Sequence, residues 1–184
     1  MTDQPLELRY DVRPDDRETV RRLVASTGVF SPVEIDVAVE LADDRLKRGR
    51  QSDYHFVFAD LHGRTVGYTC YGPIALTAAS FDLYWIAVDK AMHGRRVGRV
   101  LLERTEELIR AAGGLQVYIE TSNRHHYTPT RGFYLRCGYQ QEALLKDFYA
   151  PGDDKVIYVK GLGARGEGRG TRDGERGTGE QVNE

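Results

Sequence analysis

The chain has 184 residues, with 26 Lys and Arg against 28 Asp and Glu, a net charge of -2 and two cysteines. This length fits one domain with a substantial core and is short for two full domains. The nearly balanced charge excludes the basic excess of dedicated nucleic-acid binders, so function must come from a local site.

The sequence also bears on location and redox state. No run approaches the roughly 20 apolar residues that span a bilayer, and the N-terminus lacks a basic and then apolar signal region. We therefore expect a cytoplasmic protein with no membrane partner. Cys70 and Cys137 are isolated in the chain, and we expect both to be reduced thiols.

The first half of the chain predicts a strand, two helices and three strands. Alternating residues 6–12 indicate a strand, and Asp15 with Glu18 resembles a capping box before a helix. A second helix is predicted from Ser31, which precedes a proline and a glutamate at capping positions, to about residue 46. Aromatic and β-branched residues then favour strands over 54–59, 65–71 and 81–88.

The second half changes to helical spacing of apolar residues. Residues 97–112 predict a helix that ends at Gly113, followed by a strand over 115–120 and a short helix over 128–137. Two closing strands are expected over residues 139–148 and 155–160. The order predicts a mixed α/β fold, in which a mostly antiparallel sheet of about seven strands contains one parallel pair, 81–88 beside 115–120.

The C-terminal segment has a different composition. Residues 161–184 are rich in Gly, Arg and Glu and nearly free of apolar side chains, so they cannot bury enough surface to offset their ordering entropy. We expect a domain over residues 1–160 and a disordered tail over 161–184. An RNA-binding role for the tail is disfavoured by its interspersed acidic residues and its lack of aromatic ones.

A basic, glycine-containing turn joins the strand over 81–88 to the next helix. Unpaired amide groups and the positive end of the macrodipole make a helix N-terminus favourable for phosphate, and arginines add cationic donors. A solvated basic turn is the alternative, and neither a Walker A loop nor a dinucleotide fingerprint fits. The turn consists of His93, Gly94, Arg95, Arg96, Val97, Gly98 and Arg99.

Three segments together resemble the GCN5-related N-acetyltransferases. They are the strand end at residues 85–88, the turn at 93–98 and the segment at 133–139. The resemblance covers about residues 6–160 and implies the acyl-CoA N-acyltransferase fold, whose parallel strands are splayed. It implies acetyl-CoA as the donor, with the pyrophosphate on amide groups from residue 93 to 99. The pantetheine arm would lie along the strand end at Ile86, Ala87 and Val88.

Two residues of the turn depart from the family pattern. The family usually has Gln or Arg at the position of His93 and Gly at the position of Arg96. Arg96 brings a Cβ atom and a long side chain to a place where close approach of the ligand is expected.

Amine acetylation needs an unprotonated amine and a proton for the departing thiolate. The resemblance places Tyr134 beside the thioester sulfur as the acid, and a core aromatic residue is the alternative. Asp82 lies where histone-type members of the family carry a catalytic Glu, and Glu120 ends the parallel strand; either is a candidate base or a solvated charge. Strand alternation predicts one face with Phe81, Leu83, Trp85 and Ala87 and the other with Asp82, Tyr84, Ile86 and Val88.

The amine acceptor is the main unknown. Residues 122–130 form a long connection that is a candidate lining for the acceptor pocket, and no metal site is expected from the adjacent His125 and His126. Other candidates around the acceptor, each with packing or a solvated turn as the alternative, are Tyr71, Tyr84, Tyr127, Tyr149, Asp147, Asp153 and Asp154.

The resemblance implies an N-acetyltransferase that moves an acetyl group to a primary amine of a small molecule or peptide in a ternary complex. The alternative is a non-catalytic acyl-CoA-binding module that regulates a partner. A third hypothesis, RNA binding through the segment from Arg95 to Arg99 and the tail, predicts a steep loss of affinity with salt. No nucleic-acid partner is expected in the leading interpretation, and a homodimer stays open.

Overall fold

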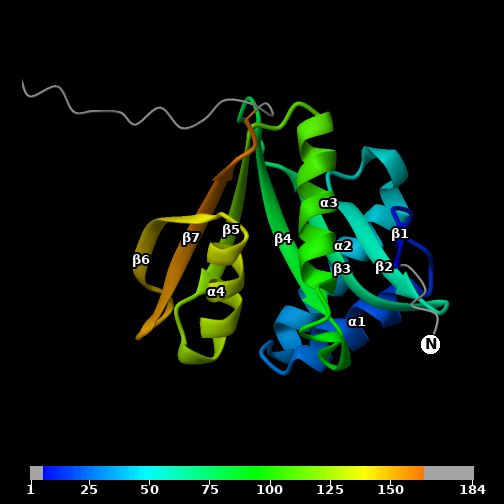
Figure 1. The fold of residues 1–184 in the computed structure, drawn as a ribbon, viewed down its shortest axis with the longest axis horizontal. Helices are drawn as coiled ribbons and strands as arrows, with labels where there is room; N and C mark the ends of the chain where they lie inside the picture. The colour runs from blue at the N-terminus through cyan, green and yellow to red at the C-terminus, as the bar shows by residue number, and fades with distance from the viewer. Residues whose placement is uncertain (1–5, 164–184) are drawn as a thin grey trace, which may run out of the picture.

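The computed structural model describes residues 6–163, which form one seven-stranded sheet covered by helices on both faces (Figure 1). The strand order is β1-β2-β3-β4-β5-β7-β6, and within residues 6–163 the only parallel pair is β4 with β5. The predicted fold class is therefore confirmed. The strands are β1 (Glu7–Arg9), β2 (His55–Leu61), β3 (Arg64–Pro73), β4 (Ser80–Val88), β5 (Gln116–Ser122), β6 (Gln140–Ala150) and β7 (Asp153–Gly161). The helices are α1 (Asp16–Thr27), α2 (Pro32–Arg48), α3 (Val97–Ala111) and α4 (Thr128–Arg136).

Both helices begin where the sequence predicts, but only the second has the predicted side-chain cap. The Ser31 hydroxyl accepts from the Glu34 amide, and the Glu34 carboxylate accepts from the Ser31 amide, which completes a capping box for α2. At α1, the predicted cap is wrong, because the Asp15 side chain makes no capping hydrogen bond. Asp16 is buried there instead, and its carboxylate accepts from Arg9 and from the Arg13 amide.

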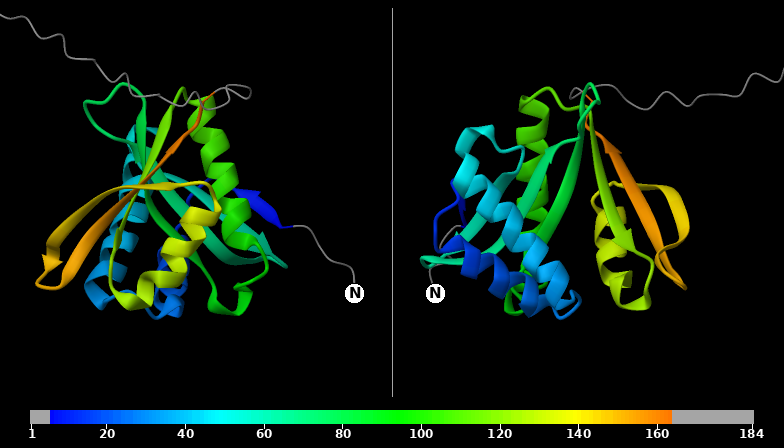
Figure 2. Two further views of the ribbon diagram at one scale, coloured as in Figure 1. Left: turned by 60° about the vertical axis from the view of Figure 1, so that its left-hand side comes forward. Right: turned by 180° about the vertical axis from the view of Figure 1, so that it is seen from behind.

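The sheet is split between its two parallel strands. β4 and β5 pair only from Ser80 to Asp82, opposite Gln116 to Tyr118, at the start of both strands. Beyond that point β4 pairs only with β3, and β5 pairs only with β7, so the two halves of the sheet diverge (Figure 2). The splayed pair implied by the resemblance is present.

Contacts at the closed end hold the two halves together. The buried Leu162 follows β7, and its carbonyl accepts from the Arg110 guanidinium of α3 at 3.1 Å. The Lys160 ammonium lies 2.7 Å from the carboxylate of Glu106 on α3, which is buried. Since β7 ends at Gly161 and Leu162 joins the core, the fold extends beyond the predicted boundary at residue 160. The rest of the predicted tail, residues 164–184, lies outside the described residues.

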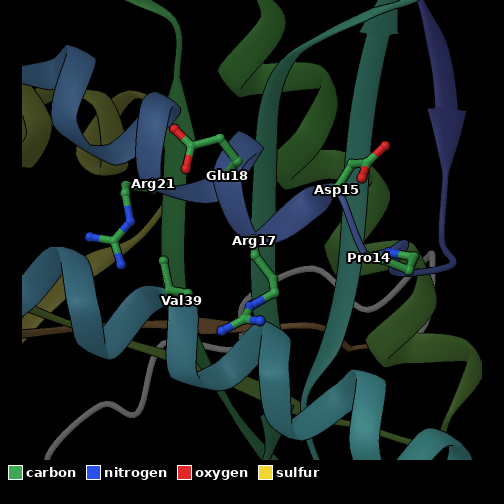
Figure 3. A pocket seen from close by; sticks show the side chains of 6 residues that line it. All are labelled: Pro14, Asp15, Arg17, Glu18, Arg21 and Val39. Atoms are coloured by element: carbon green, nitrogen blue, oxygen red, sulfur yellow. The ribbon is translucent and has the colours of Figure 1, made fainter.

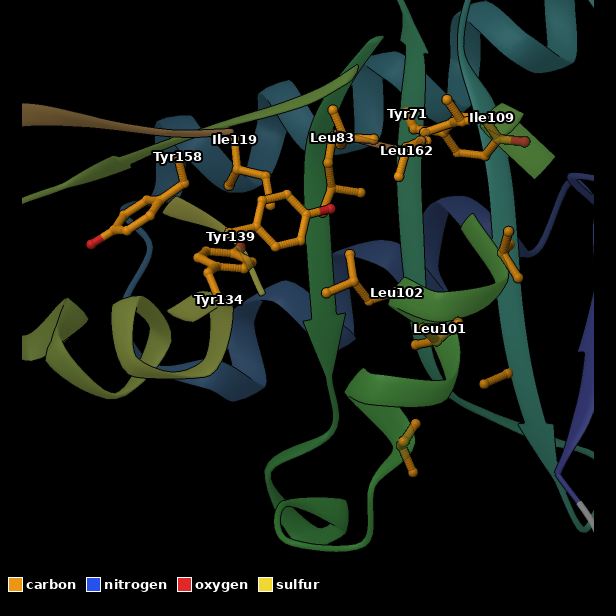
Figure 4. Packing of buried hydrophobic residues seen from close by; sticks show 14 of the residues in the cluster. Tyr71, Leu83, Leu101, Leu102, Ile109, Ile119, Tyr134, Tyr139, Tyr158 and Leu162 are labelled. Atoms are coloured by element: carbon orange, nitrogen blue, oxygen red, sulfur yellow. The ribbon is translucent and has the colours of Figure 1, made fainter. Parts of the chain in front are cut away.

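Two apolar clusters pack on opposite faces of the sheet. One lies beneath α3 and α4 and includes Leu101, Ile119 and three tyrosines, Tyr134, Tyr139 and Tyr158 (Figure 4). The other joins α1 and α2 to β2, β3 and β4.

A β-bulge in β4 overturns the predicted alternation of its side chains. Cys70 pairs with Trp85 and Tyr71 pairs with Leu83, so Tyr84 has no counterpart on β3. Residues beyond the bulge therefore change faces. Trp85 and Ala87 pack with the α1 and α2 cluster, whereas Leu83, Ile86 and Val88 pack with the α3 and α4 cluster. The grouping of Leu83 with Trp85 and Ala87 was wrong for this reason.

Several smaller features complete the described part. The first strand is shorter than predicted and ends at Arg9, where the side chain turns into the ion pair with Asp16. Cys70 and Cys137 are both free, as expected. Among residues 6–163 no helix is long and apolar enough to cross a membrane.

Candidate active site

The turn between β4 and α3 presents main-chain donors to one place. The amide groups of Gly94, Arg96, Val97, Gly98 and Arg99 donate to no acceptor among the described residues. The amides of His93 and Arg95 are engaged within the turn, with the carbonyls of Lys90 and Met92. Of the amide groups predicted to bind a ligand, from residue 93 to 99, five are therefore free to do so. They lie at the N-terminus of a 15-residue helix.

Backbone conformation explains why the turn has this shape. Gly94 has φ 78° and Arg96, the residue before α3, has φ 63° and ψ 5°, so both occupy the left-handed region. Glycine adopts that region freely, but arginine does so at a cost. The family's glycine at the position of Arg96 thus reflects a conformation that this chain also uses.

Asp89 fixes the start of the turn to the body of the protein. One carboxylate oxygen lies 3.1 Å from both Arg22 on α1 and Arg64 on β3, and the other accepts from the Ala91 amide. The Asp89 amide donates to the Val66 carbonyl of β3 at 2.8 Å. These contacts set the direction in which the chain leaves β4.

The same hydrogen bond defines which amides of β4 face the gap. Successive amides of a strand point to opposite edges, and the Asp89 amide points toward β3. The amides of Ile86 and Val88 therefore point toward the unpaired edge, as the resemblance implies for the pantetheine contacts. The amide of Ala87 points toward β3. The His93 ring contacts the end of β4, where its Nε2 donates to the Val88 carbonyl at 3.1 Å.

Gly98 has space around it within the protein. A Cβ atom at this position would lie 3.6 Å from Phe133 Cζ and 3.6 Å from Val88 Cγ2, which is ordinary van der Waals contact. The fold itself therefore does not require glycine here. The position lies between the helix N-terminus, the end of β4 and α4, where a ligand on the amides would pass.

Tyr134 lies in α4 beneath the splayed strands. Its ring is 5 % exposed and lies 6.0 Å from the rings of both Tyr139 and Tyr158 (Figure 4). Burial raises the pKa of Tyr134 far above its ordinary value. The side chain therefore stays protonated throughout the neutral range, as a proton donor must.

The two candidate carboxylates, Asp82 on β4 and Glu120 on β5, lie on the opposite face of the sheet from Tyr134. Burial, and then the charge of Glu120, raises the pKa of Asp82 to about 6, while Lys155 acts in the opposite direction. Glu120 is half exposed and forms a 2.6 Å ion pair with Lys155 of β7. The structure thus brings both predicted carboxylates together, with a lysine that the sequence analysis did not single out.

Aromatic side chains surround these carboxylates. Phe30, from the loop between α1 and α2, packs on Trp85 with ring centroids 4.9 Å apart and on Tyr127 at 6.2 Å. Burial, then Glu34 and Asp153, raises the pKa of Tyr127 to about 12, and burial, then Glu120, does so for Tyr149. The tyrosines at 84, 127 and 149 therefore share one region, which also contains Phe30 and Trp85.

The acidic residues of the last hairpin mostly serve local structure. Asp153 is buried, accepts from the Ser122 hydroxyl at 2.5 Å and pairs with Arg124 at 2.9 Å. Asp154 accepts from the Asp147 amide at 3.0 Å. The bonds of Asp153 fix the connection at residues 122–130 against the hairpin, and the bond of Asp154 lies within the hairpin. Asp153 is thus a satisfied buried charge rather than part of a solvated turn.

Two shallow surface hollows lie elsewhere. One, of about 330 Å³, is lined by α1 and α2 residues that include Arg17, Glu18 and Val39 (Figure 3). The other, of about 340 Å³, surrounds the Arg9 and Asp16 ion pair. Neither includes a predicted site residue. The polar lining of the second hollow is explained by the hydrogen bonds from Arg9 of β1 to Asp16 of α1 and Asp60 of β2.

The arrangement of a helix N-terminus beside a split parallel pair defines an acyl-CoA-type acetyltransferase fold, and comparisons with known proteins agree. The family model for the acetyltransferase (GNAT) domain matches residues 52–141. A structure of a GNAT-family protein from Desulfovibrio desulfuricans is 45 % identical, with a TM-score of 0.85, covering 86 % of this chain and all of that one. The chain belongs to the GCN5-related N-acetyltransferase family.

Two more distant relatives are consistent with this membership. An uncharacterised N-acetyltransferase from Methanocaldococcus jannaschii is 29 % identical over 57 % of this chain, and the match spans 65 % of that protein. The PaiA N-acetyltransferase from Thermoplasma acidophilum, solved with coenzyme A, is 18 % identical with a TM-score of 0.66 and covers 86 % and 99 % of the two chains. The second likeness concerns the fold alone.

Proposed function

We propose that the protein transfers the acetyl group of acetyl-CoA to a primary amine of a small molecule or peptide, by direct attack in a ternary complex. The observation that carries this proposal is the split between β4 and β5 beside a helix start with five free amide groups. Family membership supports an acyltransferase, and the coenzyme A complex of the Thermoplasma acidophilum relative supports the donor.

The residues present fit acetyl-CoA. The five amides at the start of α3, with the side chains of Arg95, Arg96 and Arg99, offer donors for a pyrophosphate. The amides of Ile86 and Val88 face the unpaired edge of β4 and would hold the pantetheine arm as an added strand does. When bound, acetyl-CoA supplies an activated thioester carbonyl.

The side chains of the site divide the proton transfers between two faces of the sheet. Tyr134 would donate its proton to the departing sulfur, since burial keeps it protonated. Asp82 and Glu120 are the candidates that receive the proton lost by the amine. A main-chain amide of β4 at or near Val88 is the proposed donor to the developing oxyanion. No covalent acyl-enzyme is required, because Cys137 lies at the end of α4 in the same cluster as Tyr134.

The acceptor would enter from the face of the sheet that α1 and α2 cover. Phe30, Trp85, Tyr127 and Tyr149 would line this entry, and Tyr149 lies near enough to Glu120 for its pKa to be raised by that charge. A primary amine that approached Asp82 from this side would meet the thioester at the split, with Tyr134 beneath it. Opposite access would let both substrates be bound at once, as a ternary complex requires.

The test has two parts. Calorimetric titration with coenzyme A should show binding to the full-length protein, and thiol release from acetyl-CoA should be measured across a panel of amines. Binding without turnover of any amine would favour the acyl-CoA-binding module. Absence of binding to folded protein would contradict both functions.

Tyr134→Phe should lower kcat by about 100-fold or more while coenzyme A affinity stays within about twofold, because the ring remains and only the proton donor is lost. Tyr158→Phe is the matched control. Its ring belongs to the same cluster, but its hydroxyl points away from Tyr134 (Figure 4), so turnover should be unchanged. Equal kcat values for Tyr134→Phe and the parent would refute the acid role.

A further inference from the structure

Lys155 is a buried cation at the edge of the proposed acceptor site. Its side chain is 11 % exposed, and its ammonium lies 2.6 Å from Oε2 of Glu120. The same ammonium lies 4.0 Å from the centroid of the Phe148 ring on β6. Glu120 and the Phe148 ring both stabilise the charge of the ammonium, and burial excludes water that would compete for it.

Asp82 lies next to this pair but does not share its ion pair. It is the last residue of β4 that pairs with β5, opposite Tyr118, and Glu120 is two residues further along β5 on the same face. The charged groups that shift its pKa are Glu120 on β5 and Lys155 on β7, and on its own strand Asp82 in turn raises the pKa of Tyr84. Three elements therefore meet at this carboxylate.

We propose that Lys155 is a positioning residue, which holds Glu120 in an ion pair and so leaves Asp82 as the general base of the acetyl transfer. This inference rests on the proposed function and deepens it. The two carboxylates were equal candidates in the sequence, and the lysine distinguishes them, because only Glu120 has its oxygen engaged by a cation at 2.6 Å.

The proposed step balances as follows. The nitrogen of a neutral amine forms a bond to the acyl carbon, the carbon–sulfur bond breaks, and the sulfur receives the proton of Tyr134. The excess proton of the nitrogen passes to Asp82, directly or through a water, and returns to the tyrosine through solvent. The pKa of Asp82, raised to about 6, suits this role, since the group is free to accept at neutral pH and is more basic than an ordinary aspartate.

Lys155 also limits how far Glu120 disturbs Asp82. Two neighbouring carboxylates repel, so the second one holds its proton to higher pH. The ammonium offsets this repulsion, as its opposite effect on the pKa of Asp82 shows. Loss of Lys155 should therefore leave Asp82 protonated over more of the neutral range, and loss of Glu120 should do the reverse.

The first experiment measures this coupling without substrates. The carboxyl carbon of Asp82 is followed by ¹³C NMR against pH in the full-length protein, with Asp82→Asn for assignment. Lys155→Met should raise the titration midpoint by about one pH unit, and Glu120→Gln should lower it by a similar amount. Lys155→Arg keeps the charge and should stay near the parent. Thermal unfolding of each variant shows that it is folded.

The second experiment measures kcat/KM against pH with an amine that the parent acetylates. The rising limb should lie near pH 6 in the parent and move with the NMR midpoint in Lys155→Met and Glu120→Gln. Glu120→Gln should keep most of its activity at pH 8, whereas Asp82→Asn should lose at least about 100-fold. A merely structural lysine would change stability and leave the limb in place.

Two results would overturn the assignment. If Glu120→Gln abolishes turnover while Asp82→Asn keeps it, Glu120 is the base. If Lys155→Met leaves the Asp82 midpoint unchanged, the lysine does not position these groups. Failure of the proposed function has another signature, since a protein that consumes no acetyl-CoA with any amine would still report the coupling by NMR.

Discussion

Arg96→Gly should make the protein more stable. Arg96 has φ 63° immediately before α3, and a left-handed conformation costs a residue with a Cβ atom about 1–2 kcal/mol. Glycine removes this cost, but it gives back about 0.5–1 kcal/mol through its larger freedom in the unfolded chain. The net gain should be about 0.5–1 kcal/mol, equivalent to roughly 1–4 °C in Tm for a domain of this size.

Arg95→Gly is the matched control. Arg95 is adjacent, equally exposed and has negative φ, so its replacement removes the same charge without relieving strain. This variant should lose about 0.5–1 kcal/mol. Urea unfolding of the two variants and the parent gives the difference in free energy of unfolding, which isolates the backbone effect. A less stable Arg96→Gly than Arg95→Gly would refute the left-handed assignment.

Two further predictions concern the turn and the closed end of the sheet. Gly98→Ala should keep or raise stability, because a methyl group meets Phe133 only at ordinary contact distance, yet it should weaken coenzyme A binding about tenfold or more by calorimetry. Unchanged affinity would mean that no ligand approaches Gly98. Lys160→Met should cost about 3 kcal/mol in urea unfolding, because it leaves the buried Glu106 carboxylate unpaired, and adding Glu106→Gln should restore much of the loss. If the double variant is no more stable than Lys160→Met, the unpaired charge is not the cause.

The order of elements was predictable because local signals and tertiary packing agree. Ser31 with Glu34 starts α2 by a contact between neighbours in sequence, and the apolar spacing of α3 matches the face that it buries. The false cap at Asp15 shows where this reasoning ends. Asp15 has the right spacing, but Arg9, which lies on β1, recruits the neighbouring Asp16 instead.

The bulge at Tyr84 could not be read from the strand itself. Strict alternation is the default for a strand, and an inserted residue becomes visible only through the register with β3. Its effect on the site is large, since it places Leu83 on the face of Ile86 and Asp82 on the face of Trp85. Trp85 packs on Phe30 on the acceptor side, while Ile86 packs with the opposite cluster and its amide faces the unpaired edge.

The donor half of the site was easier to predict than the acceptor half, because its groups are neighbours in the sequence. Phosphate donors at a helix start come from consecutive residues, so the segment from Gly94 to Arg99 carries its signal in one place. Lys155 and Glu120 are far apart in sequence and meet only because β5 pairs with β7. Hydrogen-bond register of distant strands, rather than residue type, brings these groups together.

The split sheet itself follows from where the stabilising contacts lie. Parallel pairing, the hydrogen bond from Arg110 to the Leu162 carbonyl and the Lys160 ion pair with Glu106 all join the halves at the start of β4 and the end of β7. Toward the other end, the tyrosines of the α4 cluster fill the space beneath the strands, and the main chain of β4 keeps an unpaired edge. An extended ligand arm can satisfy that edge without breaking any existing ladder bond. Binding of such a ligand should therefore add hydrogen bonds along the unpaired edge of β4, while the contacts at the start of β4 and the end of β7 keep the two halves of the sheet in place.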